Sequence, residues 1–503
     1  MLVISERVNL SGYTTLRLGG PAKRLVSAST EDEIIAAVRE ADLAGEPLLV
    51  LGGGSNLVVA DAGFAGTVVR LATAGVTVAD SGTYPLSARS VGAYPVGTGS
   101  VGAYPVSAGP VGTGPVGAYP VGTGPVGGGV AAPSADEGVR VVVQAGENWD
   151  RLVEWAVAEK LSGVECLAGI PGLVGATPIQ NVGAYGQEVA RVIEVVRAYD
   201  RVGQAIVMLT AAECGFGYRT SLFKRSQTWT EPRTQARTEP EDVPSPEISL
   251  SGKVSVPGDH FLFAQHRSGS ETSAATETGA GRGSGTGTVS GTGHGSGADA
   301  GNGSGTGSGA GAGPGNVAPT GRYVVLGVTF RLERSPMSAP VRYPELAATL
   351  GIAPGEHAPL ADVRTAVLGL RRSKGMVLDP ADPDTVNAGS FFTNPLLDRD
   401  QFARLERAVE AKLGPGAGFP HFPADHGQIK VPAGWLIEQA GFAKGYPAGG
   451  AARISAKHTL ALTNPGQAST SDLIDLAREI VAGVRSEFGI ELTNEPVLVG
   501  VTL

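Results

Sequence analysis

The sequence predicts a protein of mixed α and β structure, of the α/β or α+β class. Short apolar runs that are typical of strands alternate with segments in which apolar residues recur at helical spacing. Glycine supplies 75 of the 503 residues, about twice the ~7% usual in globular proteins, and it concentrates in two tracts outside this alternation. We therefore expect an enzyme-sized core that two glycine-rich inserts interrupt.

The first part of the core predicts a helix followed by strands. Thr30 and Glu33 have the spacing of a capping box, and apolar residues then recur at helical spacing, so a helix is expected over residues 30–44. Residues 149–161 are amphipathic and predict a second helix. Strands are expected at residues 47–51, 57–59, 66–71 and 139–145.

The rest of the core predicts a further mixed unit. Strands are expected at residues 192–199, 323–332, 458–463 and 496–501. Helices are expected at residues 402–413, 435–440 and 472–488. The last third of the chain therefore has apolar elements enough for a core of its own.

The two inserts have compositions that oppose regular structure. Residues 91–125 are seven consecutive pentads of the VGAYP and VGTGP type, and residues 227–320 are rich in Ser, Thr and Gly. Proline every five residues removes backbone donors, and glycine loses the most entropy on ordering, so both tracts are expected to be disordered. Removing residues 81–136 and 228–320 leaves 354 residues, which suits two or three compact units.

Composition argues against several classes of protein. The net charge of −9 and the pI near 5.4 disfavour a nucleic-acid partner. No apolar run reaches the ~18 residues of a membrane span and no secretory signal begins the chain, so a cytoplasmic protein without membrane contact is expected. Cys166 and Cys214 are the only thiols and are expected to be free and buried, although one bridge is possible. Without HExxH, CxxC or GxSxG patterns, neither a metal centre nor a serine hydrolase is expected.

Two glycine loops are candidates for a nucleotide site. Residues 52–56 (GGGSN) follow a strand but lead into another strand, which disfavours a Rossmann nicotinamide site, where a helix should follow. Residues 167–186 form a second loop with five glycines. Because glycine allows close backbone approach, the two loops together could direct N–H groups at a diphosphate, whereas either loop alone could be a tight turn.

Seven ordered motifs resemble the UDP-N-acetylenolpyruvoylglucosamine reductase family. They are TTLRLGGPA (14–22), LGGGSNL (51–57), GENW (146–149), IPGLVGATPIQNVGAYG (170–186), FGYR (216–219) with FK (223–224), NAGSFFTNP (387–395) and AGWLI (433–437). The match runs over essentially the whole chain outside the two inserts.

The resemblance implies an α+β fold: an FAD-binding region of the vanillyl-alcohol-oxidase type in two α+β subdomains, followed by an α+β substrate domain. The subdomains would be residues 1–80 and 137–227, with residues 321–375 completing the second, and the substrate domain would be residues 376–503. It also implies a monomer that passes hydride from NADPH through FAD to the enolpyruvyl ether of a UDP-sugar. Deleting residues 81–136 should then leave flavin binding intact.

The resemblance further assigns residues to three roles. Arg219 would hold the substrate carboxylate, Ser390 would protonate the α-carbon, and Glu495 would assist as an acid or stabilise the enolate-like intermediate. FAD would contact Gly52, Gly53, Gly54, Ser55, Asn56, Pro171, Gly172, Gly175, Ala176, Thr177, Gln180, Asn181, Gly183, Tyr185 and Gly186. The UDP-sugar would contact Tyr343, Arg371, Lys374, Asn394 and Gln439.

Each catalytic residue also has an ordinary structural interpretation. Arg219 could form a surface ion pair, Ser390 could cap a turn, and Glu495 could lie on a solvated strand edge. Two other functions stay open: an oxygen-using alcohol oxidase with the same FAD-binding fold, and an interaction protein built around the inserts. The NAGSFF segment, the basic RRSK segment (371–374) and Glu495 favour the reductase, because an oxidase needs no proton-donating serine beside a diphosphate-binding lysine.

Overall fold

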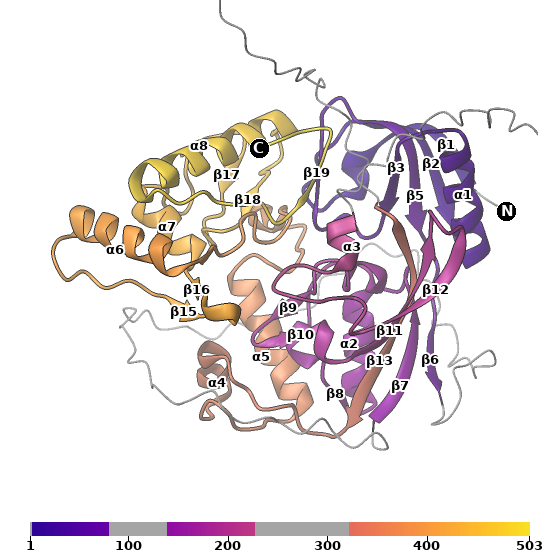
Figure 1. Cartoon of the computed structure of the whole chain (residues 1–503), viewed down its shortest axis with the longest axis horizontal. Coiled ribbons are helices and arrows are strands. Elements are labelled where there is room, and N and C mark those ends of the chain that lie inside the picture. Colours follow the sequence, from indigo (N-terminus) through magenta and orange to yellow (C-terminus); the bar gives the residue numbers. More distant parts are fainter. Residues whose placement is uncertain (1–2, 80–137, 227–320) are drawn as a thin grey trace, which may run out of the picture. The chain divides into compact units, whose positions relative to one another are not determined.

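The computed structural model describes residues 3–79, 138–226 and 321–503, and the expectations for inserts 81–136 and 228–320 lie outside these ranges. Within the described ranges, both helices and strands are present, which confirms the mixed α and β class (Figure 1). No helix in these ranges is long and apolar enough to cross a membrane.

A four-stranded sheet carries the first glycine loop. Its order is β1-β2-β5-β3, with β1 antiparallel to β2 and the other pairs parallel. Helix α1 (Glu31–Leu43) joins β2 to β3 and buries Ile34 and Val38 completely. The strands are β1 (Val3–Asn9), β2 (Pro21–Ala28), β3 (Leu48–Leu51) and β5 (Phe64–Leu71). The helix expected at 30–44 and the strands expected at 47–51 and 66–71 are confirmed.

The capping box predicted for α1 is only half correct. The Thr30 side chain accepts a hydrogen bond from the Glu33 backbone N–H, as an N-cap should. The Glu33 carboxylate, however, accepts from the backbone N–H and hydroxyl of Ser29 rather than from Thr30. The helix start is therefore fixed by Thr30, with Ser29 supplying the second bond.

A second, six-stranded sheet supports the other glycine loop. Its order is β12-β11-β13-β7-β6, all antiparallel, with β8 pairing to the end of β13. The strands are β6 (Val76–Ala79), β7 (Gly138–Gln144), β8 (Leu161–Ser162), β11 (Ile193–Asp200), β12 (Ala205–Thr210) and β13 (Tyr323–Arg334). The strands expected at 139–145, 192–199 and 323–332 are confirmed.

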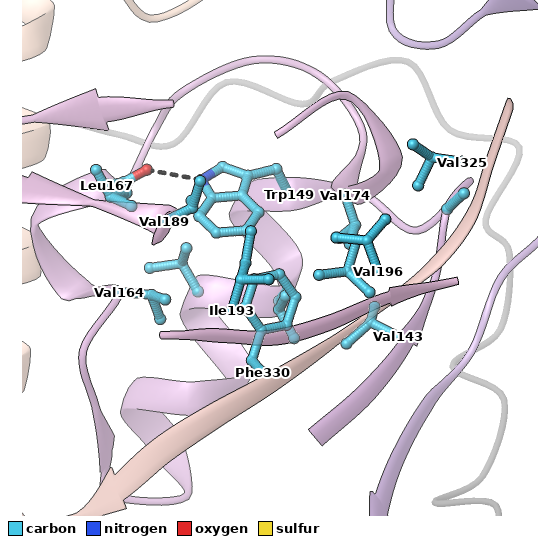
Figure 2. Packing of buried hydrophobic residues seen from close by; sticks show 14 of the residues in the cluster. Val143, Trp149, Val164, Leu167, Val174, Val189, Ile193, Val196, Val325 and Phe330 are labelled. Carbon is cyan, nitrogen blue, oxygen red and sulfur yellow. Dashed lines mark hydrogen bonds between the residues drawn. The ribbon is translucent and has the colours of Figure 1, made fainter. Parts of the chain in front are cut away.

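Helix α2 (Trp149–Ala158) packs its tryptophan into the core of this region. The Trp149 ring lies 6.0 Å from the Phe330 ring, and its indole N–H donates to the Leu167 carbonyl at 3.0 Å (Figure 2). The prediction that this helix extends to residue 161 is wrong. Lys160 has a left-handed backbone (φ 57°), so the helix ends before it and Leu161–Ser162 pairs with β13 instead.

The C-terminal part has its own apolar core around three helices, α6 (Arg399–Leu413), α7 (Ala433–Gln439) and α8 (Thr470–Phe488). These confirm the helices expected at 402–413, 435–440 and 472–488. The strand expected at 458–463 is largely wrong, because only Leu462–Thr463 (β18) is extended. Before it, the Ser455 hydroxyl accepts the N–H groups of Lys457 and His458 and so forms a turn.

The remaining elements are short or connect the two cores. Helices α4 (Pro344–Leu350) and α5 (Leu360–Ser373) follow β13, and α3 (Leu222–Arg225) is a single turn. Two-residue strands are β9 (Gly183–Ala184), β10 (Gln187–Glu188), β14 (Leu396–Leu397), β15 (Phe422–Pro423), β16 (Ile429–Lys430) and β17 (Arg453–Ile454).

The end of the chain returns to the first glycine loop. The strand expected at 496–501 is observed as β19 (Val497–Val499), and the strand expected at 57–59 as β4 (Leu57–Val59); the two pair in parallel. The Val497 N–H donates to the Asn56 carbonyl at 2.9 Å. This pairing brings Glu495 beside the loop that contains residues 52–56.

Candidate active site

A cavity of about 420 Å³ lies where both glycine loops, α5 and the C-terminal segment meet. The predicted site residues that line it are Gly52, Gly53, Gly54, Ser55, Asn56, Pro171, Gly172, Gly175, Ala176, Thr177, Gln180, Gly183, Tyr185, Arg219, Tyr343, Arg371, Lys374, Ser390 and Glu495. Segments that are hundreds of residues apart in the sequence therefore share one cavity, of a size usual for small-molecule sites.

The two glycine loops touch through their backbones. A Cβ atom added to Gly53 would lie 2.7 Å from the Gly172 Cα, closer than real Cβ contacts occur. A Cβ on Gly54, whose φ is +62°, would lie 1.8 Å from the Tyr13 carbonyl oxygen. The Ser55 hydroxyl then donates to the Pro171 carbonyl at 2.8 Å. Only glycine satisfies the geometry at Gly53 and Gly54, and this close approach builds one wall of the cavity.

The first loop offers unused backbone donors. Within the described residues, no hydrogen bond uses the N–H groups of Gly53, Gly54, Ser55 or Asn56. Successive free N–H groups in a glycine-rich turn bind phosphate oxygens. Together with the apolar remainder of the wall, which includes Leu49, Trp149 and Val325, the loop fits a nucleotide cofactor with a diphosphate and an aromatic ring system.

Two predicted cofactor residues are not among those that line the cavity. Asn181 is 2% exposed, accepts the Ala190 N–H, and donates to Glu188 and to the Gly217 carbonyl. These bonds hold the second loop in shape. Gly186 has φ +83° and forms the turn between β9 and β10.

Arg219 and Glu495 form an ion pair in the cavity wall. The Arg219 Nε lies 2.9 Å from the Glu495 Oε1, and an Arg219 Nη donates to the Gly183 carbonyl at 2.8 Å. Arg219 has a left-handed backbone (φ 52°), an uncommon conformation for a large side chain. The Glu495 backbone N–H donates to the Phe391 carbonyl, which ties the Glu495 backbone to the loop that carries Ser390.

Burial raises the pKa of Glu495 above its ordinary value, and the nearby charges of Arg219 and Lys224 only partly oppose this effect. A carboxyl group with a raised pKa retains its proton to a higher pH than an ordinary carboxyl group does and can donate it there. Glu495 is therefore suited to act as an acid in the cavity.

Ser390 reaches the same cavity from a tight turn. Gly389 has φ +76°, and its N–H donates to the Asn387 side chain at 2.8 Å. The Phe391 N–H donates to the Leu460 carbonyl, so bonds on both sides fix the turn. Among the described residues, the Ser390 hydroxyl has no hydrogen-bond partner and is free to interact with a ligand.

A group of aromatic and basic side chains closes another side of the cavity. The Tyr185 and Tyr343 rings meet edge to face at 5.4 Å, and the Lys374 ammonium lies 5.7 Å from the Tyr185 ring centre. Lys374 also pairs with Glu345 at 2.6 Å. Arg371 is 8% exposed, and its Nε has no hydrogen-bond partner in the described part of the chain. A buried, incompletely bonded guanidinium at a cavity attracts an anion.

Two further residues, His458 and Lys224, were not predicted as site residues from the sequence but also line this cavity. Burial lowers the pKa of His458 to about 4, and the charges of Lys374, Lys444 and Arg371 act in the same direction. Nothing in the local sequence places His458 in the cavity, because it comes from the turn before β18. Lys224 could have been found, since it belongs to the FK motif after FGYR.

The last two predicted substrate residues lie elsewhere. Asn394 lines a second cavity, of about 750 Å³, and its side chain accepts the Ala433 N–H at the start of α7. Arg219 and Lys224 line both cavities, so they stand in the wall between them. Gln439 is the last residue of α7 and lines neither cavity.

Other sequence expectations concern thiols and metals. Cys166 and Cys214 are free and buried, as expected. In the three described ranges, no group of three or more His, Cys, Asp or Glu side chains is arranged to hold a metal ion.

Comparison with family models gives two matches. Residues 22–84 and 133–208 match the FAD binding domain family, and residues 380–499 match the C-terminal domain of UDP-N-acetylenolpyruvoylglucosamine reductase. The first match contains both glycine loops (residues 52–56 and 167–186), and the second contains Ser390 and Glu495. The cavity therefore lies at the junction of the two matched regions.

Similar proteins match the whole chain. A UDP-N-acetylenolpyruvoylglucosamine reductase from Thermobifida fusca is 42% identical over 499 residues, which cover 99% of both chains. A reductase of the same name from Streptomyces avermitilis is 40% identical over 495 residues, covering 98% of this chain and 94% of that one. The crystal structure of the reductase from Thermus caldophilus aligns over 99% of this chain and all of its own, with 20% identity and a TM-score of 0.47.

Proposed function

Because the chain belongs to the UDP-N-acetylenolpyruvoylglucosamine reductase family, we propose that Arg219, Glu495 and Ser390 carry out that family's reaction in the cavity between the matched regions. The protein is an FAD-dependent oxidoreductase that takes its hydride from NADPH and acts on a UDP-sugar in peptidoglycan precursor synthesis. The observation that carries the assignment of residues is the Arg219–Glu495 ion pair, formed across 276 positions of sequence in a cavity that Ser390 also lines.

The glycine loops fit the cofactor. The free N–H groups of residues 53–56 would bind the diphosphate, and the close contact of Gly53 with Gly172 would leave room for it against the backbone. Bound FAD supplies the hydride that is added to the β-carbon of the enolpyruvyl ether. Every other part of the reaction falls to side chains of this chain.

Arg219 provides positive charge where negative charge develops. When hydride adds to the β-carbon, electron density moves to the α-carbon and into the carboxylate. A guanidinium remains charged at all working pH values and can hold a carboxylate through two N–H groups. The bond from an Arg219 Nη to the Gly183 carbonyl keeps the guanidinium in place before the substrate arrives.

Ser390 and Glu495 supply the protons. The free Ser390 hydroxyl would give its proton to the α-carbon, which completes the reduction with one hydride and one proton added across the double bond. A serine alkoxide must then be reprotonated, and Glu495, whose pKa burial raises, is an acid in the same cavity. Glu495 would also donate to the enolate-like oxygen while the charge is present.

The nucleotide half of the substrate would meet the aromatic and basic group. Lys374 and Arg371 would neutralise the diphosphate, while Tyr343 and Tyr185 would cover it. Asn394 would reach the substrate from the side of the second cavity. We further propose that the protein acts as a monomer in the cytoplasm, where UDP-sugars and NADPH are available.

An absorbance experiment separates this proposal from an oxygen-using oxidase. The purified protein is made anaerobic, NADPH is added, and the enolpyruvyl UDP-sugar follows. The proposal expects NADPH to bleach the visible flavin band and the sugar to restore it. Restoration by oxygen but not by the sugar would establish the oxidase, and a protein without flavin would contradict both functions.

A further inference from the structure

Lys224 is held at the cavity by rigid surroundings. It lies in the single-turn helix α3, whose N-cap residue Ser221 accepts the Lys224 N–H at 3.3 Å and donates to the Ile179 carbonyl at 2.5 Å. The preceding Phe223 is 2% exposed and packs edge to face against Tyr323 at 6.1 Å. The bonds of Ser221 and the buried Phe223 ring therefore hold the backbone of Lys224, a residue that lines both cavities.

The Lys224 ammonium has no fixed partner in the described part of the chain. Lys374 of the same cavity pairs with Glu345, Arg219 pairs with Glu495, and Arg371 donates to the Met376 carbonyl. Among the described residues, the Lys224 ammonium forms no ion pair and no hydrogen bond. A half-buried cation without a partner loses hydration without compensation, which a bound anion would restore.

The charges at this end of the cavity do not cancel. With Glu495 ionised in its pair with Arg219, the three groups together carry one positive charge, that of Lys224, and with Glu495 protonated they carry two. An enolpyruvyl ether carries one negative carboxylate. If Lys224 were absent, that carboxylate would enter a site whose single guanidinium is already paired with a carboxylate.

We propose that Lys224 is a substrate-binding residue that provides the positive charge for the enolpyruvyl carboxylate, and that Arg219 orients this carboxylate while it remains paired with Glu495. The proposal rests on the reductase function stated above and adds a residue to that site. It makes Lys224 responsible for recognising the carboxylate, not the nucleotide.

Two ligands that differ in the enolpyruvyl group, which carries the carboxylate, test the proposal by calorimetry. The FAD-loaded, oxidised enzyme is titrated without NADPH with the enolpyruvyl UDP-sugar and, separately, with UDP-N-acetylglucosamine, which has no carboxylate. Lys224→Gln should weaken binding of the enolpyruvyl sugar by roughly 10- to 100-fold, the range for a lost charge-assisted bond, and leave UDP-N-acetylglucosamine within about twofold. Lys224→Arg should recover most of the loss, because it keeps the charge.

The control is Lys430→Gln, which removes a lysine that lies near Tyr218 and lines neither cavity. It should change neither affinity by more than about twofold, because the lost charge is screened. Equal weakening of both ligands in Lys224→Gln would overturn the proposal, since Lys224 would then act on the nucleotide or on the shape of the cavity. No change for either ligand would also overturn it.

A pH profile gives an independent measurement. The charged groups that act on Lys224 in the described structure are Glu495 and Arg219. Removing the lysine removes a charge that lowers the pKa of Glu495, so the pH above which the sugar-dependent step declines should rise in Lys224→Gln. An unshifted profile in Lys224→Gln would contradict the proposal. Wild-type enzyme that fails to reduce the sugar at all would instead contradict the reductase function on which the proposal rests.

Discussion

The two sides of the cavity are built in different ways. On the side of the glycine loops, backbone meets backbone, and an added Cβ at Gly53 or Gly54 would collide with main-chain atoms. Elsewhere in the lining, the surface is made by long charged side chains such as Arg219, Lys374 and Glu495, which come from separate segments. The first side depends on close backbone packing and on its free N–H groups, whereas the second depends on charge and on the balance between neighbouring ionisable groups.

This difference predicts different consequences of mutation. A change on the backbone side should act on folding and cofactor binding together, because the loops hold each other in place. A change on the charged side should leave the fold and the flavin in place and alter one step of the reaction. The four predictions below test that separation, from the largest expected effect to the smallest.

Gly54→Ala should give the largest effect. The new Cβ would lie 1.8 Å from the Tyr13 carbonyl oxygen at a backbone φ of +62°, so both steric overlap and left-handed strain oppose it. We expect a loss of at least about 3 kcal/mol in the free energy of unfolding, with little flavin in the purified protein. Flavin content by absorbance and denaturant unfolding measure the two effects.

Gly45→Ala is the matched control. Gly45 has nearly the same φ, +63°, but a Cβ there would meet nothing within 4 Å. It should therefore cost only about 1 kcal/mol, from backbone strain, and retain full flavin. If the two variants behave alike, close approach between the loops does not determine the structure of the backbone side.

Glu495→Gln tests the charged side. The amide keeps the size of the side chain but cannot give up a proton, so reoxidation of the reduced enzyme by the enolpyruvyl sugar should slow by roughly 10²- to 10⁴-fold. Reduction by NADPH should stay within a few fold, and flavin content should not change. Stopped-flow absorbance separates the two half-reactions. The exposed Glu491, which lines only the second cavity, provides the control Glu491→Gln.

The pH dependence of the sugar-dependent step should also have a definite direction. Because burial raises the pKa of Glu495, its protonated form persists above the usual range and is lost as pH rises through the raised value. The sugar-dependent step of the wild type should therefore decline on the alkaline side, and the residual step in Glu495→Gln should not show that decline. A variant with the same alkaline decline would assign the proton to another group.

Local sequence specifies the backbone side more directly than the charged side, and the reason is physical. A close backbone approach requires glycine at fixed spacing, so GGGSN and the second loop carry their structure in local sequence. The charged side is assembled by β19 pairing with β4 and by the turn before β18, and these are contacts between distant segments. His458 could not be found for this reason, whereas Gln439, proposed for the substrate, lies at the end of α7 away from both cavities.

The fold shows the same division. Helices with local signals were predicted, such as α1 with its Thr30 N-cap and α8 with its strong apolar periodicity. The end of α2 was misplaced, because pairing of Leu161–Ser162 with β13 competes with helix propagation and no local residue marks the change. Strand β1 was not predicted, since its side chains are largely exposed and show little apolar alternation.

Mutation of His458 should have an effect of intermediate size, and the effect should be on the pH dependence of stability instead of on catalysis. Burial first, and then the charges of Lys374, Lys444 and Arg371, lower its pKa from 6.5 to about 4. The unfolded chain therefore binds more protons between these values, and the protein should lose up to about 3 kcal/mol of unfolding free energy as pH falls from 6.5 to 4. His458→Gln should remove that part of the pH dependence in urea titrations, and the exposed His421→Gln should not. Equal slopes in wild type and His458→Gln would contradict the prediction.

Deletion of residues 81–136 should have the smallest effect. Strands β6 and β7 are antiparallel, and Ala79 lies opposite Arg140, so the chain leaves and re-enters the sheet at one place. After the deletion, four residues would connect Ala79 to Arg140, a usual length for a hairpin loop. Because the entropy of loop closure grows only with the logarithm of length, the gain in stability should not exceed about 2 kcal/mol.

Flavin content of the deletion variant decides what this result means for the backbone side of the cavity. The residues known to line that side all lie outside 81–136, so flavin absorbance per protein should equal that of the full chain. A soluble deletion variant without flavin would mean that residues 81–136 take part in cofactor binding. The backbone side would then depend on more than the close contact of its two glycine loops.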